Sequence, residues 1–144
     1  MAQKINDITA TNWQLSLRAP GAVAQGIDDI RQCIQTILTT TQGSDPMRPL
    51  FGSVIWKYID TPVMQGVSSI SAEILDSIGK WENRIIIRKL AYDVDGSRID
   101  YAMNVTLLES GESTEILFFI DRRQQLEKPP LGHAFSNGFN FGFS

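Results

Sequence analysis

The most notable pair of opposite charges in the sequence is Glu82 and Arg84, which stand on either side of Asn83. The pair follows Trp81 at the end of a helical pattern and precedes a β-branched triplet, Ile85–Ile87. At such a corner, two opposite charges can point outward together and offer an acceptor and a donor to another molecule. The alternative is an ion pair within the chain that stabilises the turn, because most exposed ion pairs recognise nothing. Both interpretations stay open on these residues alone.

Other acidic side chains raise the question of glycoside hydrolysis. Glu73 and Asp76 are three residues apart on a predicted helix and therefore neighbours on its surface. A carboxylate pair needs a saccharide cleft and a separation of roughly 5 to 9.5 Å, and nothing in the sequence supplies that cleft. Glu82 as the general acid of a small muramidase is the enzymatic alternative, but a nearby arginine favours the charged carboxylate. We therefore predict no catalytic residues and no enzymatic activity.

The remaining reactive residue types are sparse. A single cysteine, Cys33, excludes an internal disulfide and a cysteine-rich zinc site. A single histidine, His133, has no neighbouring acid or cysteine in the sequence, so we predict no metal site and no cofactor. The adjacent Asp28 and Asp29 suit solvent contacts in the first turn of a helix, where the helix dipole favours them. Arg48 is the one polar loop side chain singled out as a candidate, against the alternative of a solvated loop arginine.

The composition is that of a soluble globular domain. The chain has 144 residues, a hydrophobic share of 42% and a net charge of −3. The acidic balance argues against a nucleic-acid partner, which needs a basic surface. We expect no membrane span, because no apolar run approaches ~20 residues, and the first residues lack the apolar core of a signal peptide.

Helical patterns dominate the first half of the chain. Apolar residues at helical spacing predict a helix over about 26–40 and a second over about 67–81. A proline-containing loop and a short helix at about 54–59 separate them. Residues 1–20 are expected to be extended, either as a strand around Trp13 or as an arm that Trp13 anchors.

Three antiparallel strands follow Arg84. The first covers about 84–94, the Asp95-Gly96 turn predicts a hairpin, and residues 99–107 alternate in polarity. The third, 115–121, is apolar on both faces. It is therefore either covered on both sides or available to bind a partner. The sequence thus predicts an α+β fold with two to three helices packed on one face of a small antiparallel meander of three or four strands.

Charge is unevenly distributed over these strands. Between Ala91 and Asp121 there are seven acids and one base, Arg98. Such charge protects an open sheet edge from indiscriminate pairing and suits a basic partner surface.

The last segment changes character and predicts a domain boundary. Residues 1–121 are expected to form one α+β domain, and residues 122–144 an extended tail rich in glycine and phenylalanine. Aromatic residues with flexible spacers can dock into a groove of another subunit or add a strand to its sheet. A tail that folds back on its own domain is the equally favoured alternative.

The order of these parts resembles the contractile-tail baseplate family that includes phage baseplate assembly protein W and the lysozyme-like baseplate subunit of type VI secretion. The resemblance covers roughly residues 7–121. It depends on the following pieces, in this order: Asp7-Ile8 with Trp13, Leu38-Thr39-Thr40, Arg48-Pro49-Leu50-Phe51-Gly52, and Trp81-Glu82-Asn83-Arg84-Ile85. The family hallmark is Glu-Pro-Arg, in which Asn83 here replaces the proline.

The resemblance implies a structural role in the tail baseplate of a virion, assembled in the host cytoplasm. The implied partners are wedge proteins, tail tube or hub proteins and the first ring of sheath subunits, which gain strands from the sheet edge and the tail. The residues implied in wedge contact are Trp81, Glu82, Asn83, Arg84 and Arg48. Those expected in sheath contact are Ile116, Phe118, Ile120, Phe135, Phe139, Phe141 and Phe143. A generic adaptor domain outside any tail stays an alternative.

Overall fold

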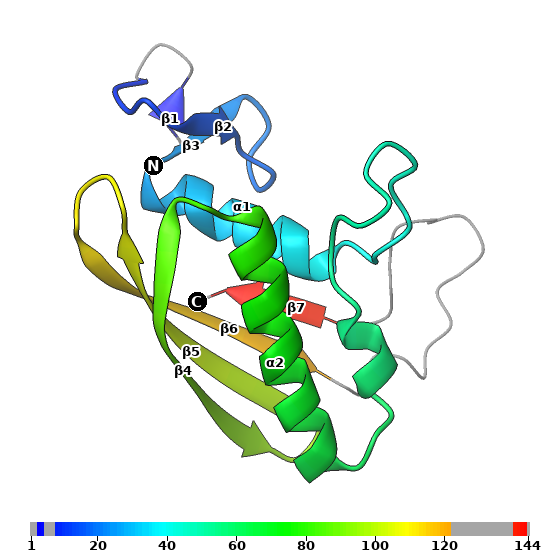
Figure 1. The fold of residues 1–144 in the computed structure, drawn as a ribbon. Coiled ribbons are helices and arrows are strands. Elements are labelled where there is room, and N and C mark those ends of the chain that lie inside the picture. Colours follow the sequence, from blue (N-terminus) through cyan, green and yellow to red (C-terminus); the bar gives the residue numbers. More distant parts are fainter. Residues whose placement is uncertain (1–2, 5–7, 122–139, 144) are drawn as a thin grey trace. The chain divides into compact units, whose positions relative to one another are not determined.

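The computed structural model describes residues 3–4, 8–121 and 140–143 (Figure 1). The chain divides into two compact units, Met1–Thr36 and Ile37–Ser144. In chain order the elements are β1 (Gln3–Lys4), β2 (Trp13–Leu15), β3 (Ala22–Gln25), α1 (Ile27–Thr39), the 3-10 helix η2 (Ile55–Tyr58), α2 (Val63–Trp81), β4 (Ile85–Asp95), β5 (Arg98–Leu107), β6 (Ser113–Asp121) and β7 (Asn140–Phe143). The predicted α+β class is confirmed.

The first unit contains a small sheet that the sequence did not reveal. Its strand order is β1-β3-β2, so β3 is the central strand. Trp13 lies in β2 and pairs with Gln25, and its side chain is 46% exposed. The strand alternative for this region is therefore the one observed. β3 was missed because its Ala-Val-Ala run has no polar residue to show a two-residue period.

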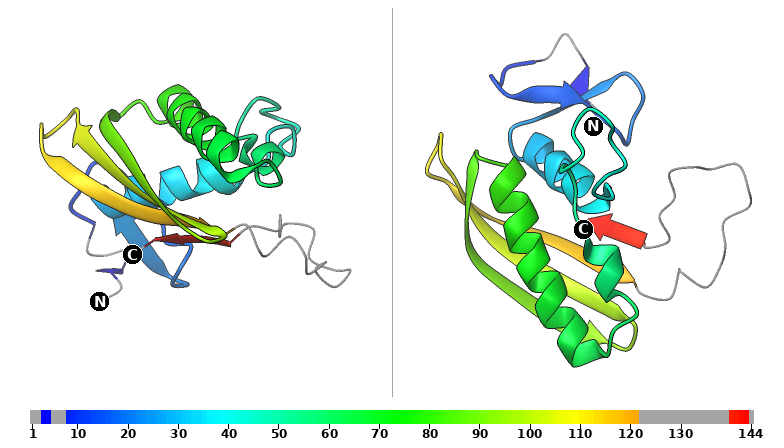
Figure 2. Two further views of the ribbon diagram at one scale, coloured as in Figure 1. Left: turned by 90° about the horizontal axis from the view of Figure 1, so that it is seen from below. Right: turned by 45° about the vertical axis from the view of Figure 1, so that its right-hand side comes forward.

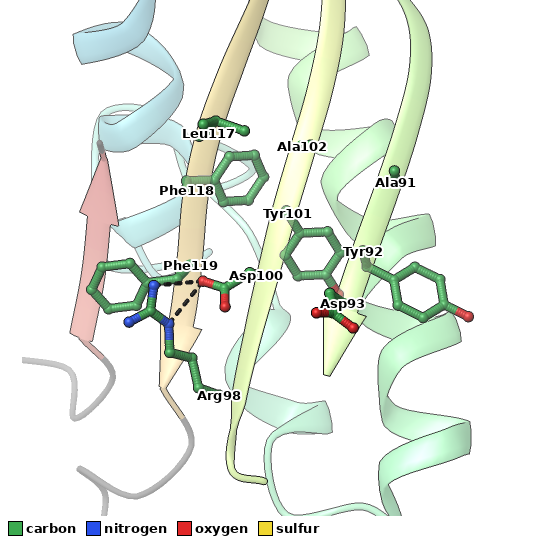
Figure 3. Close-up of a pocket in the computed structure, with 10 residues that line it drawn as sticks. All are labelled: Ala91, Tyr92, Asp93, Arg98, Asp100, Tyr101, Ala102, Leu117, Phe118 and Phe119. Atoms are coloured by element: carbon green, nitrogen blue, oxygen red, sulfur yellow. Dashed lines mark hydrogen bonds and ion pairs between the residues drawn. The ribbon is translucent and has the colours of Figure 1, made fainter. Parts of the chain in front are cut away.

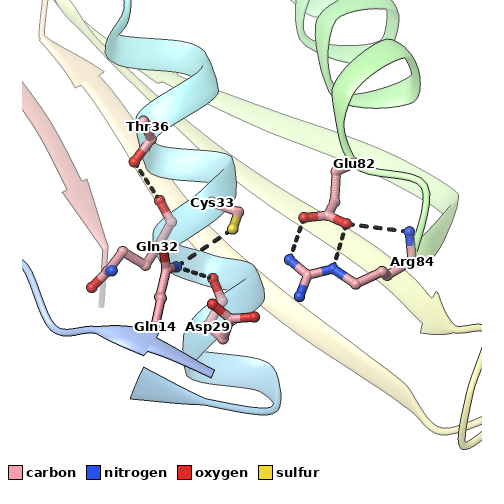
Figure 4. A network of polar contacts seen from close by, with 7 residues as sticks. All are labelled: Gln14, Asp29, Gln32, Cys33, Thr36, Glu82 and Arg84. Carbon is pink, nitrogen blue, oxygen red and sulfur yellow. Dashed lines mark hydrogen bonds and ion pairs between the residues drawn. The ribbon is translucent and has the colours of Figure 1, made fainter. Parts of the chain in front are cut away.

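Glutamine side chains connect β2 with the helix that follows. Gln32 accepts a hydrogen bond from the Leu17 N–H at 2.8 Å and donates to the Leu15 carbonyl at 2.7 Å. Gln14 donates to the Asp29 carbonyl at 3.0 Å (Figure 4). The expectation that Asp29 contacts solvent is wrong, because this residue is only 3% exposed.

The second unit is built on a four-stranded antiparallel sheet in the order β4-β5-β6-β7. The helix α2 lies across one face of this sheet (Figures 1 and 2). Alternate residues of β5 are buried, as the two-residue period predicts, and their neighbours are partly exposed. The fully buried side chains of this unit come from the end of α1, α2, β5, β6 and the 3-10 region and include Leu38, Ile70, Ile74, Ile78, Tyr101, Met103, Ile116 and Ile120.

For strand β6 the sequence left two alternatives open, a strand covered on both sides and a strand without its partner. It pairs with β5 along its whole length and with β7 over its second half, where Phe118 stands opposite Phe143. Its apolar residues divide between a buried face and a partly exposed one: Ile116 is 0% exposed and Leu117 is 41% exposed. The side chains of Ile116, Phe118 and Ile120 therefore belong to the core, and the predicted role of these residues in sheath contact stays a prediction.

The described part of the tail folds back onto its own domain. β7 adds the fourth strand that the prediction had left optional, and Phe141 stands opposite Ile120 in its register. Phe135, Phe139 and His133 lie outside the described residues, and the boundary expected at residue 121 stays a prediction. None of the helices in the described ranges is long and apolar enough to cross a membrane.

Candidate functional site

Glu82 and Arg84 form a closed ion pair at the end of α2 (Figure 4). The Glu82 carboxylate accepts hydrogen bonds from Arg84 Nε at 2.8 Å and Nη2 at 2.7 Å, and from the Arg84 backbone N–H at 3.2 Å. The Glu82 side chain is 5% exposed and the Arg84 side chain 28% exposed. The intrachain pair is therefore present, and the guanidinium is its more accessible half. Paired, bidentate geometry of this kind orients an arginine strongly.

Backbone hydrogen bonds attach this corner to both the helix and the sheet. The Glu82 N–H donates to the Ile78 carbonyl at 2.8 Å and closes the last turn of α2. The Arg84 carbonyl accepts from the Leu108 N–H at 2.9 Å, just beyond the end of β5. Asn83, in the position of the family proline, is exposed. The turn is thus held by these bonds and by the ion pair, without the rigid φ of a proline.

The structure brings Arg48 to the same corner through an aromatic side chain. The Arg48 guanidinium lies 4.3 Å from the centre of the Phe51 ring, and Phe51 meets Trp81 edge-to-face at 5.2 Å between centroids. Such cation–π and aromatic pairs each contribute roughly 0.5–1.5 kcal/mol. We name Arg48, Phe51, Trp81, Glu82 and Arg84 the α2 corner. Phe51 was the member missed as a site residue, although it stands in the Arg48–Gly52 segment that carried the family resemblance.

Consecutive turns in the loop place Arg48 over Phe51. The Arg48 N–H donates to the Asp45 carbonyl at 3.2 Å, and the Phe51 N–H to the Arg48 carbonyl at 2.9 Å. Arg48 Nε also contacts the Asp45 carboxylate at 3.1 Å. Hydrogen bonds from the Met47 N–H and from Arg48 lower the pKa of Asp45. These contacts favour a single orientation of Arg48, whose side chain is 59% exposed.

Gly52 ends this loop where no other residue fits. Its φ is +102°, and a Cβ there would lie 2.2 Å from the Thr40 carbonyl oxygen. The next residue, Ser53, donates its N–H to that same carbonyl at 2.9 Å and its hydroxyl to the Leu38 carbonyl at 2.9 Å. The close approach of the two segments therefore explains the glycine, since L side chains rarely adopt this φ.

The carboxylates considered for glycoside hydrolysis have structural partners. Glu73 accepts the Val54 N–H at 2.9 Å, just before η2. Asp76 pairs with Lys80 at 3.1 Å on the exposed surface of α2. Among the described residues no group of three or more histidine, cysteine or acidic side chains could hold a metal ion.

The half of β6 that precedes the β7 pairing has an open edge. The Leu107 N–H donates to the Glu112 carbonyl at 2.9 Å, and hydrogen-bonded pairs alternate along an antiparallel ladder. In the observed register, this alternation directs the N–H groups of Ser113, Glu115 and Leu117 away from β5. Within the described ranges no strand pairs with Ser113–Leu117 on that side.

Comparison with known proteins places this architecture in a family. Residues 24–108 match the family model described as baseplate wedge protein gp25, which covers more than half of the chain and the whole α2 corner. No curated protein matches the sequence with significance.

Solved structures agree with the family match. A chain of the pyocin R2 baseplate after contraction shares 31% identity and a TM-score of 0.57, over 67% of this chain and 98% of that one. A protein from Geobacter sulfurreducens, provisionally described as a tail lysozyme, shares 20% identity and a TM-score of 0.61, over 66% and 89% of the two chains. A chain of the anti-feeding prophage baseplate shares 20% identity and a TM-score of 0.55, over 68% and 82%. At 20% identity the last two show the fold alone, but the family model and the pyocin relative together establish that this chain belongs to the baseplate wedge protein gp25 family.

Proposed function

We propose that this protein links wedge and hub proteins in the baseplate of a contractile tail and initiates sheath polymerisation by strand addition. The observation that carries the proposal is the family match, because it includes every residue of the α2 corner. The proposed location is the tail particle, with assembly in the host cytoplasm. The proposed partners are wedge proteins, tube or hub proteins and the first ring of sheath subunits.

The α2 corner is the proposed contact with wedge proteins. Two cations, Arg48 and Arg84, are oriented there before any partner binds, one by Phe51 and one by Glu82. Binding to pre-oriented side chains loses less conformational entropy than binding to free ones. The exposed Asn83 and the partly exposed Trp81 complete the proposed surface.

Copurification with wedge proteins tests this contact. Glu82→Gln retains the shape of the side chain but removes the charge that orients Arg84, and Arg84→Ala removes the cation. Both variants are expected to lose wedge binding, whereas Arg88→Ala, an exposed cation of β4, is expected to retain it. Thermal unfolding of each variant separates lost binding from lost folding. Normal binding by a folded Arg84→Ala variant contradicts the proposed wedge contact.

The open edge of β6 is the proposed site of strand addition for sheath. The outward N–H groups of Ser113, Glu115 and Leu117 are donors that a partner strand needs. Glu115→Pro removes one outward donor, and proline is tolerated at sheet edges. We expect this variant to fold but not to nucleate ordered sheath tubes with sheath subunits under electron microscopy. Glu115→Gln is the matched control, and normal seeding by the proline variant contradicts this site.

The C-terminal tail is the second proposed sheath element. Removal of residues 122–144 deletes β7 together with Phe135, Phe139, Phe141 and Phe143, and it is expected to stop sheath nucleation. Full seeding activity of the shortened chain, with unchanged wedge binding, contradicts a role of the tail.

An enzymatic function is the less favoured candidate. The Glu82 carboxylate, the proposed acid of that alternative, is 5% exposed and already engaged by three hydrogen bonds from Arg84. We expect no Glu82-dependent release of peptidoglycan fragments when wild type and Glu82→Gln are compared. Peptidoglycan release by the wild type that Glu82→Gln abolishes would show that the protein is an enzyme.

A further inference from the structure

The second unit carries a hollow of about 400 Å³ on its sheet, lined by residues of β4, β5 and β6 (Figure 3). Ala91 and Ala102 stand opposite each other in the register of β4 and β5, and Leu117 stands opposite Ala102 on β6. Two small side chains beside a large one leave room above the sheet. Arg98, Asp93, Asp100 and Phe119 complete the surroundings.

The hollow lies on the sheet face opposite the core. Its alanines and Leu117 alternate with Tyr92, Tyr101 and Phe118, and side chains of neighbouring residues in a strand point to opposite faces. Tyr101 and Phe118 are 1% and 3% exposed, whereas Leu117 is 41% exposed. The exposed apolar floor therefore belongs to the face that α2 does not cover.

Acidic side chains surround this apolar floor. In the register of β4, β5 and β6, this face has five acids against the bases Lys89 and Arg98, and Arg88 at the bulge of β4 also reaches Thr106 on this face at 3.4 Å; the acids are Asp93, Asp95, Asp100, Glu115 and Asp121. Arg98 is already engaged, since it lies 2.6 Å from the Asp100 carboxylate and 4.2 Å from the centre of the Phe119 ring. Asp93 accepts a hydrogen bond from the Val94 N–H at 3.0 Å and has no cation partner in the described part of the chain.

From this arrangement we propose that the hollow docks a segment of a partner protein in which a lysine or arginine stands beside a large aliphatic side chain. The aliphatic group covers Ala91 and Ala102 against Leu117, and the cation faces Asp93. This surface is separate from the α2 corner, and it adjoins the open edge of β6, because the Leu117 side chain lines the hollow while its backbone lies on that edge. It gives the baseplate subunit a third contact, selected by charge complementarity around an apolar centre.

A protein segment fits this surface better than other ligands. The acidic surroundings repel nucleic acid and anionic lipid. Small-molecule sites bury about 70–90% of a drug-sized ligand, which an open sheet face with an exposed floor does not achieve. A short segment laid across the sheet needs to bury only one or two side chains.

Peptide titration of the full chain tests the docking site. The probe is a ten-residue peptide with glycine–serine ends and alternating leucine and lysine between them. Its binding is monitored by the NMR chemical shifts of the protein's backbone amides. We expect the shifts to centre on β4–β6 around Ala102, and the affinity to fall about tenfold with Asp93→Lys or Leu117→Ser. Peptides with glutamate for lysine, or serine for leucine, are expected to bind at least about tenfold more weakly.

Matched variants keep this test decisive. Leu108→Ser and Glu109→Lys change an exposed apolar residue and an exposed acid away from the hollow, and they are expected to leave the affinity unchanged. Ala102→Leu fills the hollow without changing charge and is expected to block binding. Equal binding of the glutamate peptide, or shifts that none of the variants at the hollow reduces, overturns the proposal. Self-association that Leu117→Ser abolishes also overturns it, because a second copy of the chain is then the occupant.

Discussion

The carboxylate of Glu82 holds the guanidinium of Arg84 by bonds of 2.8 and 2.7 Å, although a single residue separates them in the chain. The two partners differ sharply in exposure, at 5% for Glu82 and 28% for Arg84. One buried acid thus orients one accessible base. The same hydrogen bonds therefore stabilise the turn after α2 and orient the accessible guanidinium at the surface.

This asymmetry predicts unequal costs for the two alanine substitutions. Arg84→Ala leaves a nearly buried carboxylate without its cation and is expected to lower the free energy of unfolding by about 1–3 kcal/mol. Glu82→Ala leaves an arginine that water can solvate and is expected to cost less. The double variant is expected to be no less stable than Arg84→Ala. Urea unfolding of all three measures the coupling, and additive losses contradict a direct pair.

A second prediction concerns Gly52. Gly52→Ala places a Cβ against the Thr40 carbonyl at a φ of +102°, so the two segments must separate or the backbone must change. We expect a loss of at least ~1–3 kcal/mol in the free energy of unfolding. Gly79→Ala on α2, where a Cβ meets nothing within 4 Å, is the control and is expected to be neutral or stabilising. Similar stability of the two variants contradicts the assigned role of Gly52.

A third prediction concerns Phe51, the aromatic link between Arg48 and Trp81. Phe51→Leu keeps an apolar side chain but removes the ring that both neighbours contact at 4.3 and 5.2 Å. Wedge binding is expected to weaken about three- to tenfold, in line with the loss of one aromatic pair and one cation–π contact. Copurification or titration with the wedge proteins provides the measurement. Trp56→Leu, a half-exposed aromatic residue in η2, is the control.

The fourth prediction is a loss of stability at high pH through Tyr101. Burial raises the pKa of Tyr101 to about 12, above the value of about 10 expected in an unfolded chain. Between these two values the folded state binds more protons than the unfolded state, so the free energy of unfolding falls as pH rises. The loss is on the order of 2 kcal/mol. Tyr101→Phe is expected to reduce this pH dependence of the free energy of unfolding, measured by urea unfolding between about pH 9 and 12. If the variant shows the same pH dependence as the wild type, groups other than Tyr101 cause the loss of stability.

Periodicity alone determined most of the secondary structure. The apolar spacing of residues 26–40 and 67–81 marked both helices within a few residues of their observed bounds, and the Asp95-Gly96 turn and the alternation of β5 marked the hairpin. These signals are local, because a single face of a helix or strand must be apolar to reach the core. In the small sheet only a strand around Trp13 was considered. β1 was missed because its two residues are too few to show a period, and β3 because its Ala-Val-Ala run has no polar residue.

Contacts between distant parts of the chain were decided only by the tertiary structure. The sequence identified Glu82, Arg84 and Arg48 as candidates, but it did not show that Phe51 brings Arg48 to Trp81, more than thirty residues away. It described β6 as apolar on both faces without showing which edge β7 covers, because register depends on pairing with other strands. The acidic hairpin was visible in the composition. Its hollow exists only because the register places Ala91, Ala102 and Leu117 in one row across three strands.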